Sequence, residues 1–287
     1  AVAYANAASL LQTLDRQGWP KRQHRIVAFA PTFNDPVSPP KPKDSLSIPS
    51  TLLERKFIQL RNELGPLPGA KRTTNFLKEN FRAQVFDGQN VHDQLFKSAA
   101  ANFDIIHFGT HAIIDDEYPL KSRLILSSLS EASSEKDLEM WELYGLNLPA
   151  QLAVLTACKT GSGTYKKGEG IISLARAFLM AGCPSVVTSL WYIGDEATST
   201  INQSFYTYLA EGLTKDEALR RAKLDYLSNS NNSDDAHPFF WAGIIGIGNR
   251  QAVHLGPTAG ISLNWLLGMG LALCTFLWFW YRKRKKN

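Results

Sequence analysis

The chain has 287 residues, of which 44% are hydrophobic and 20% are charged. This composition is ordinary for a globular protein and excludes a disordered or collagen-like chain. The formal net charge is +5, but five of the 31 basic residues lie in the basic tail, residues 282–287. The other 26 basic residues balance the 26 acidic ones. The body of the protein is therefore neutral, and we expect no nucleic-acid partner.

Three cysteines, Cys158, Cys183 and Cys274, are an odd number at wide spacing. Such a set gives neither a disulfide framework nor a zinc site, and we expect no metal and no cofactor. Cys183 precedes a proline in an apolar stretch, so we predict a small buried side chain. A disulfide between Cys158 and Cys183 stays open at this point, and it would exclude Cys158 as a nucleophile.

In the first half of the chain, the sequence predicts strands that alternate with helices. An N-terminal helix over residues 1–22 is expected to end a preceding repeat region, so that the chain would be a fragment. A proline-rich loop at 34–50 follows the first strand. The predicted strands are 25–30, 83–86, 103–110 and 124–126. The predicted helices are 50–64, 91–101 and, after a polar loop, 137–144.

The second half continues the alternation. A strand over 152–158 leads into a glycine-rich loop at 161–170, which lacks the Gly-Lys-Ser/Thr ending of a P-loop. We interpret it as a peptide-binding loop rather than a phosphate cradle. The remaining predicted elements are a helix over 171–181, a strand over 185–191, helices over 195–211 and 214–227, and a closing segment at 239–247. This order predicts an α/β fold with a mostly parallel central sheet covered on both faces.

The end of the chain changes character. Residues 260–281 are 22 residues without a charge, which is long enough to cross a bilayer. We predict a transmembrane helix there, joined to the globular domain by a linker at 251–259. The basic tail, 282–287, suits a cytoplasmic flank. We therefore expect a single-pass membrane protein whose domain lies outside the cytoplasm, in the periplasm; the alternative is a domain that faces the cytoplasm.

Two predicted strands lead to reactive side chains at their carboxyl ends. His111 directly follows the strand 103–110, and Cys158 is the last residue of the strand 152–158. The two residues are 47 positions apart. The carboxyl ends of parallel strands meet at one edge of a sheet, and a histidine there can take the proton of a cysteine that attacks as a thiolate. His107 faces the same side as His111 at a distance of about 13 Å along the strand. We predict His111 as the base and His107 as a hydrogen-bonded core residue.

The cysteine lies in Thr156-Ala-Cys-Lys-Thr-Gly161, a relaxed form of the caspase motif Gln-Ala-Cys-x-Gly, at a similar spacing from its histidine. Further blocks lie at 107–111, 168–178, 189–198 and 237–242. Together the blocks resemble the CHAT domain family, peptidases of the caspase and separase clan that often accompany tetratricopeptide repeats. The resemblance covers about residues 24–249. It implies a caspase-like three-layer sandwich over residues 23–250.

The resemblance also implies an activity and its site. The expected function is a cysteine endopeptidase that cleaves a protein or peptide substrate through a thioester on Cys158, with His111 as its base. The backbone N–H groups of Ala112 and Cys158 would form the oxyanion hole, although the family usually has glycine at the position of Ala112. The alternative function is a catalytically silent CHAT-fold module for protein interaction or signalling.

The same resemblance implies a specificity residue and a partner. Asp195 stands where separase-like relatives carry an acidic residue for the first specificity pocket, which would favour Lys or Arg before the scissile bond. The alternative is that Asp195 caps its own predicted helix. The association of the family with repeats implies a regulatory repeat domain or partner protein.

Overall fold

The computed structural model describes residues 25–33, 60, 64–88, 91–126, 137–157, 160–161, 163–166, 170–230, 234–253 and 255. The predicted N-terminal helix, Cys158 and the predicted membrane span at 260–281 lie outside these residues. Among the helices within them, none is both long enough and apolar enough to cross a bilayer.

A six-stranded sheet in the order β11-β10-β7-β3-β1-β2 forms the centre of the fold. Neighbouring strands pair in parallel except at one edge, where β11 runs antiparallel to β10. The predicted mostly parallel sheet is confirmed. The four inner strands are buried along their whole length because both faces of the sheet are covered. The strands are β1 (Ile26–Pro31), β2 (Gln84–Gly88), β3 (Ile105–Phe108), β7 (Leu152–Leu155), β10 (Ser185–Ser189) and β11 (Ile244–Gly248).

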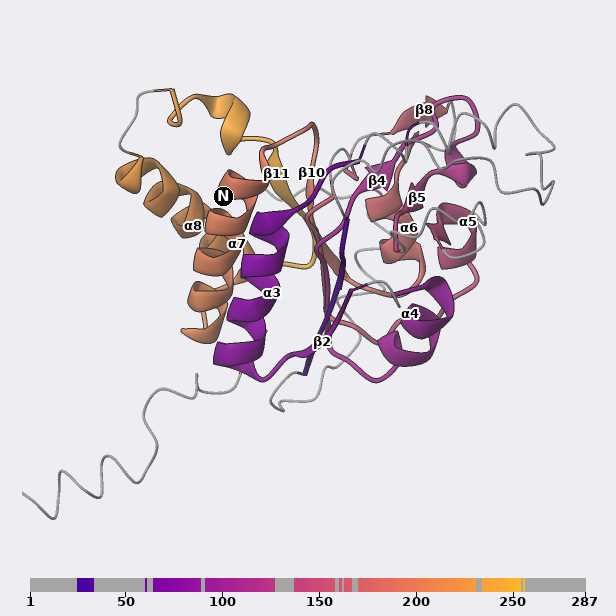
Figure 1. The fold of residues 1–287 in the computed structure, drawn as a ribbon, viewed down its shortest axis with the longest axis horizontal. Helices are drawn as coiled ribbons and strands as arrows, with labels where there is room; N and C mark the ends of the chain where they lie inside the picture. The colour runs from indigo at the N-terminus through magenta and orange to yellow at the C-terminus, as the bar shows by residue number, and fades with distance from the viewer. Residues whose placement is uncertain are drawn as a thin grey trace, which may run out of the picture.

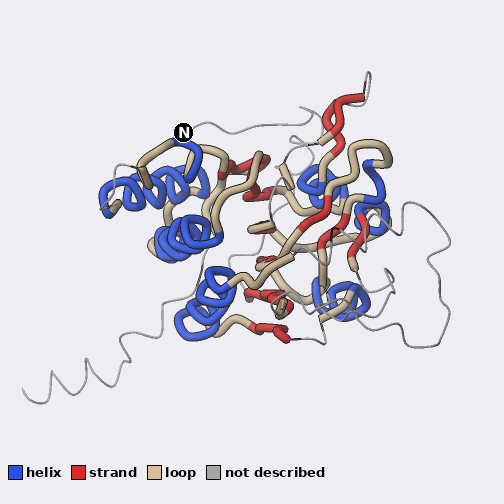
Figure 2. Tube along the Cα trace, turned by 45° about the horizontal axis from the view of Figure 1, so that its top comes forward, coloured by secondary structure: helices blue, strands red, loops and turns tan. Residues whose placement is uncertain are grey.

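Helices cover both faces of this sheet (Figures 1 and 2). One face carries α3 (Pro68–Phe81), α7 (Asp195–Ala210) and α8 (Lys215–Asn229). The other face carries α4 (Asp93–Ala100), α5 (Met140–Leu143) and α6 (Leu174–Met180). Each layer of helices has its own apolar core, which includes Ile201 and Phe205 on the first face and Phe96 and Phe178 on the second. The result is a three-layer α/β domain.

Two small sheets are added to this framework. The first is antiparallel and consists of β4 (Ala112–Ile113), β5 (Arg123–Leu124) and β6 (Leu138–Glu139). The second is a hairpin of β8 (Thr164–Lys166) and β9 (Gly170–Ile172), which begins in the predicted glycine-rich loop and extends two residues beyond it. Short 3-10 turns lie at Pro119–Lys121 and Pro238–Phe240.

Several predicted elements need correction. The strand predicted at 124–126 belongs to the small sheet rather than the central one. The helix predicted at 137–144 begins only at Met140, because Leu138 pairs with Leu124 in a strand first. The helix predicted at 171–181 begins at Leu174, because the Ser173 hydroxyl accepts a hydrogen bond from the Arg176 N–H and caps it.

The helix α3 was not predicted at all. The sequence at its start is typical of a loop, because Pro66, Pro68 and Gly69 follow one another closely. Proline is nevertheless favoured in the first turn, where its missing N–H is not needed, and Pro68 occupies that turn. The helix ends at Phe81, and the C-cap residue Arg82 adopts a left-handed conformation with φ of 52°.

Candidate functional site

The strands β3 and β7 are direct neighbours and run in parallel, with Phe108 paired to Leu155. His111 follows Phe108 by three residues, and Cys158 follows Leu155 by three residues. Residues paired across the two strands are therefore separated by the same number of positions as His111 and Cys158. Neighbouring strands lie about 4.8 Å apart, so the chain leaves both strands at adjacent points of one sheet edge. The pairing itself stays a prediction, because Cys158 lies outside the described residues.

His111 is held in a partly buried position beyond the end of β3. Its Nε2 donates a hydrogen bond of 2.8 Å to the carbonyl oxygen of Gly65, because a carbonyl oxygen can only accept. The ring also packs edge-on against Phe33, with the ring centroids 4.7 Å apart. These contacts fix the ring and assign the lone pair of the neutral imidazole to Nδ1.

The charge state of His111 follows from its surroundings. Burial lowers the pKa of the His111 imidazole, and the hydrogen bond to Gly65 and the negative charge of Asp195 act in the opposite direction. The lowered pKa leaves the ring neutral at pH 7. A neutral, oriented imidazole is the form required of a general base.

His107 has a different environment in the middle of β3. The side chain is fully buried, its Nδ1 lies 3.1 Å from the hydroxyl of Tyr206, and its buried Nε2 has no hydrogen-bond partner among the residues that the structure describes. Burial lowers the pKa of His107 to about 3, so the ring is neutral. The prediction that His107 is a hydrogen-bonded core residue is confirmed.

The turn that follows β7 is tied to its surroundings by hydroxyl groups. The carbonyl oxygen of Ala157 accepts hydrogen bonds from Thr160 Oγ1 at 3.0 Å and from Ser189 Oγ at 3.2 Å. Thr160 Oγ1 also lies 2.6 Å from Thr188 Oγ1, and the Thr160 carbonyl accepts from the Ala175 N–H. The residues on either side of positions 158 and 159 are thus fastened to β10 and to the first turn of α6. These bonds fix the described residues on both sides of the predicted nucleophile.

Ala112 begins β4 directly after His111. The His111 carbonyl accepts a hydrogen bond of 2.9 Å from the Ile125 N–H, which makes these two residues a hydrogen-bonded pair of the antiparallel ladder. Because such pairs alternate with non-hydrogen-bonded ones, the N–H of Ala112 is turned away from β5. This orientation is compatible with the oxyanion-hole role that stays predicted for it.

Asp195 is the first residue of α7, whose N-cap position is occupied by Gly194 without a side-chain cap hydrogen bond. The Asp195 carboxylate instead accepts hydrogen bonds from the Gly69 N–H and from the Ala70 N–H, the latter at 2.9 Å. A Cβ atom at position 69 would lie 2.4 Å from the Asp195 carbonyl oxygen, so glycine permits the close approach. The predicted capping of its own helix is therefore wrong: Asp195 caps the neighbouring α3.

Cys183 is a free thiol in the core. Its Sγ donates to the Ser185 carbonyl oxygen at 3.3 Å, and burial raises the pKa of the thiol to about 12. The prediction of a small buried residue is confirmed, and such a thiol is chemically inert.

Three contributors to the site are not predicted by the sequence: Gly65, Thr160 and Ser189. Gly65 acts through its backbone carbonyl, which carries no residue-specific signal, and lies 46 residues before His111. Thr160 and Ser189 act through hydroxyl groups that are common in loops. The Thr-Gly pair that follows the cysteine, Thr160-Gly161, was the available signal for Thr160.

The human and mouse proteins named tetratricopeptide repeat protein 28 are 26% and 24% identical to the chain over 250 residues. Each match covers 76% of this chain but 10% of the relative. The chain thus corresponds to about a tenth of the length of these curated relatives.

Among solved structures, the complex of the pro- and mature domains of RgpB from Porphyromonas gingivalis aligns with a TM-score of 0.48 and 9% identity, over 80% of this chain and 48% of the other. The separase–securin complex of Saccharomyces cerevisiae aligns with a TM-score of 0.43 and 11% identity, over 84% of this chain and 13% of the other. The sequence matches the CHAT domain over residues 1–249. The chain belongs to the CHAT domain family.

Proposed function

We propose that the chain is a cysteine-type endopeptidase of the caspase-like kind, with Cys158 as nucleophile and His111 as general base. The observation that carries the proposal is the shared offset of 47 residues, which relates Phe108 to Leu155 across β3 and β7 and also relates His111 to Cys158. Membership of the CHAT family supports it further.

The steps of the reaction follow from the orientation of His111. The neutral ring takes the proton of the Cys158 thiol on Nδ1 while the sulfur forms a bond to the peptide carbonyl carbon. The developing oxyanion is stabilised by the N–H groups of Ala112 and Cys158. His111 then gives the proton to the departing amine as the C–N bond breaks, and a thioester remains. Water hydrolyses the thioester, which releases the acid product and restores the thiol.

Asp195 supports a preference for Lys or Arg before the scissile bond. It lies near enough to His111 for its negative charge to oppose, in part, the lowering of the His111 pKa by burial. An ionised carboxylate has about four acceptor sites, and the N–H groups of Gly69 and Ala70 use two of them. The remaining capacity would serve a substrate guanidinium or ammonium group.

The test is cleavage of a peptide library that contains Lys, Arg, neutral and acidic residues at the varied position. Cys158→Ala is expected to abolish cleavage while the thermal unfolding curve stays unchanged. Cys183→Ala is the matched control, because it removes a buried thiol with no proposed role, and it should retain cleavage. Cleavage by Cys158→Ala at the wild-type rate would refute the proposal.

A second candidate is a catalytically silent interaction module. It is supported by the curated relatives, whose names refer to tetratricopeptide repeats and to no enzymatic activity. The same relatives support a repeat domain or partner protein as regulator. The library assay separates the two candidates when it is run on the chain alone and again with a tetratricopeptide-repeat protein added. Cleavage in either assay supports the peptidase, and no cleavage in both supports the interaction module.

We further propose that residues 260–281 anchor the domain in a membrane. Support comes from 22 residues without a charge, followed by the basic tail, 282–287. After the outer membrane of intact cells is permeabilised, an added protease should digest a periplasmic domain. It should not digest the tail, which would lie in the cytoplasm. A chain without 260–287 should leave the membrane fraction.

A further inference from the structure

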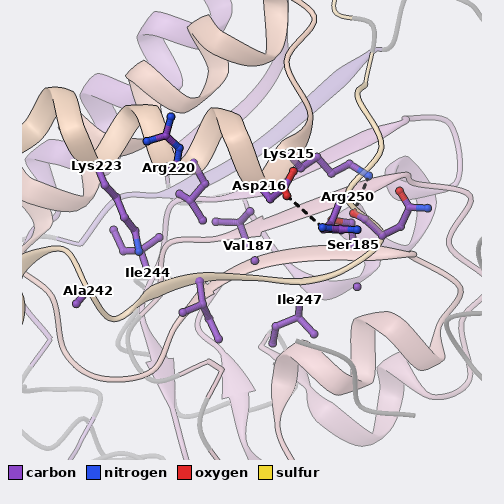
Figure 3. Close-up of a pocket in the computed structure, with 15 residues that line it drawn as sticks. Ser185, Val187, Lys215, Asp216, Arg220, Lys223, Ala242, Ile244, Ile247 and Arg250 are labelled. Atoms are coloured by element: carbon purple, nitrogen blue, oxygen red, sulfur yellow. Dashed lines mark hydrogen bonds and ion pairs between the residues drawn. The ribbon is translucent and has the colours of Figure 1, made fainter. Parts of the chain in front are cut away.

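A pocket lies between α8 and the edge strand β11 (Figure 3). Its volume is about 270 Å³, and its apolar wall includes Val187 of β10, Leu219 of α8 and Ile244 of β11. The proposed peptidase mechanism uses none of these residues. The pocket is therefore a separate feature of the domain.

The pocket exists because β11 lacks a side chain where α8 faces it. Ile244 belongs to the core on the α8 side, whereas Ile245 and Ile247 belong to the opposite core. Because side chains alternate along a strand, position 246 also faces α8, and it is a glycine. A Cβ atom added to Gly246 would touch only Leu219 Cδ2, at 4.0 Å. Room is thus left for a side chain from another molecule.

The backbone of β11 is oriented to receive a further strand. The Gly243 carbonyl accepts from the Leu190 N–H at 2.9 Å, and the Asn249 N–H donates to the Pro184 carbonyl at 2.8 Å. Since the antiparallel ladder alternates, positions 245 and 247 also bond to β10. The N–H and C=O of Gly246 therefore point to the other side, where β11 is the last strand of the sheet in the described part of the chain. Edge strands of this kind add peptide strands.

The charge of the pocket is strongly positive. Lys215, Arg220, Lys223 and Arg250 line it together with one acidic residue, Asp216. Arg250 pairs with Asp216 at 3.6 Å, and Arg220 is bonded to Glu217.

Lys223 differs from the other cations. Within the described residues it pairs with no carboxylate; its Nζ lies 5.8 Å from the ring centre of Trp241. Figure 3 shows its side chain extending from α8 toward Ile244 of β11. Burial without a partner lowers the pKa of Lys223 to about 8. Leaving a half-buried ammonium group without an anion is costly, and an incoming carboxylate would remove that cost.

We propose that this pocket is a docking site for an acidic, extended segment of a partner protein, which adds to β11 as a strand and places a Glu or Asp side chain opposite Gly246, against Lys223. Backbone hydrogen bonds to Gly246 supply affinity, and the charge pair selects the side chain. The inference is independent of the peptidase chemistry, and it assigns the domain a second contact with other proteins.

The experiment measures binding of fluorescein-labelled peptides of alternating Thr and Val with a central Glu, Gln or Lys. The chain carries Cys158→Ala so that cleavage cannot interfere. The Glu peptide is expected to bind about tenfold more tightly than the Gln peptide, and the Lys peptide should not bind. Lys223→Gln should remove the preference for Glu and leave the Gln peptide unaffected. Lys78→Gln, the same change at an exposed position of α3, is the control.

A second variant, Gly246→Val, fills the pocket with a side chain that suits a strand, and it should abolish binding of all three peptides. If that variant fails to fold, the preference for the Glu peptide in Lys223→Gln and in Lys78→Gln still tests the proposal. Equal binding of the Glu, Gln and Lys peptides would overturn the proposal. So would self-association of the chain that Gly246→Val abolishes, because a second copy of β11 would then be the occupant.

Discussion

Phe108 pairs with Leu155 across β3 and β7, and the 47-residue offset of this pair is also the offset between His111 and Cys158. A parallel pair of strands keeps its register to the end. The spacing of the two reactive residues is therefore built into the sheet, and the chain leaves both strands at the same level.

Thr160 should matter for catalysis although its side chain has no chemical role. Thr160→Val removes the hydroxyl that bonds to the Ala157 carbonyl and to Thr188. Loss of these buried hydrogen bonds is expected to cost about 1–3 kcal/mol of stability and to lower kcat more than it raises KM. Thr200→Val, which removes an exposed hydroxyl bonded to the Glu196 carbonyl within α7, is the control. Equal kcat values for the two variants would show that the turn does not position the nucleophile.

Asp195 is predicted to have two separable effects. Asp195→Asn removes the charge at the start of α3 and one of the two oxygens that accept from Gly69 and Ala70, which should cost about 1–2 kcal/mol in denaturant unfolding. It should also lower kcat/KM for Lys and Arg substrates about tenfold while neutral substrates are cleaved as before. Glu196→Gln removes a neighbouring exposed charge, paired with Arg72, and should alter neither substrate preference nor stability appreciably. A wild-type preference for acidic substrates would reject the specificity role.

The pH profile of kcat/KM should report the environment of His111. Burial lowers the pKa of this histidine below its ordinary value of 6.5, and only the neutral ring can accept a proton. Activity is therefore expected to persist at pH 6.5 and to be lost at a lower pH, as the ring becomes protonated. An acidic limb centred above pH 6.5 would contradict the buried, neutral base.

His107 should make the stability of the fold depend on pH. Its pKa is about 3 in the folded protein and about 6.5 in the unfolded chain. Between these values the unfolded chain binds one more proton, so the free energy of unfolding falls by about 1.4 kcal/mol for each pH unit as pH decreases from 6.5 toward 3. Above pH 6.5 the contribution is complete. Urea unfolding of wild type and His107→Leu across this range measures it, and parallel slopes would contradict the buried neutral ring.

Much of the fold was predictable because its strands are continuous apolar runs. The strand over 103–110, the strand over 152–158 and the helix over 195–211 correspond to β3, β7 and α7, with differences at their ends. The element that could not be predicted, α3, begins with loop-forming residues and is stabilised by Asp195, which lies more than a hundred positions later. Stabilisation from so far along the chain leaves no local pattern.

The candidate site also contains residues that the sequence identifies and residues that it does not. His111 was identifiable because it follows an apolar strand and contributes a reactive side chain. Gly65 was not, because it contributes a backbone carbonyl that any residue would offer. The hydrogen bonds from α3 to Asp195 could not be predicted, because a carboxylate at a helix start usually caps its own helix, whereas tertiary packing brings α3 within its reach.

The most direct test of the central claim is the rate at which iodoacetamide alkylates Cys158 at pH 7, followed by mass spectrometry of the peptide that contains it. If His111 takes the proton of Cys158, wild type should react about a hundredfold faster than His111→Gln. His237→Asn, a change at an exposed histidine that caps a 3-10 turn, should react like wild type. Equal rates for wild type and His111→Gln would contradict the account.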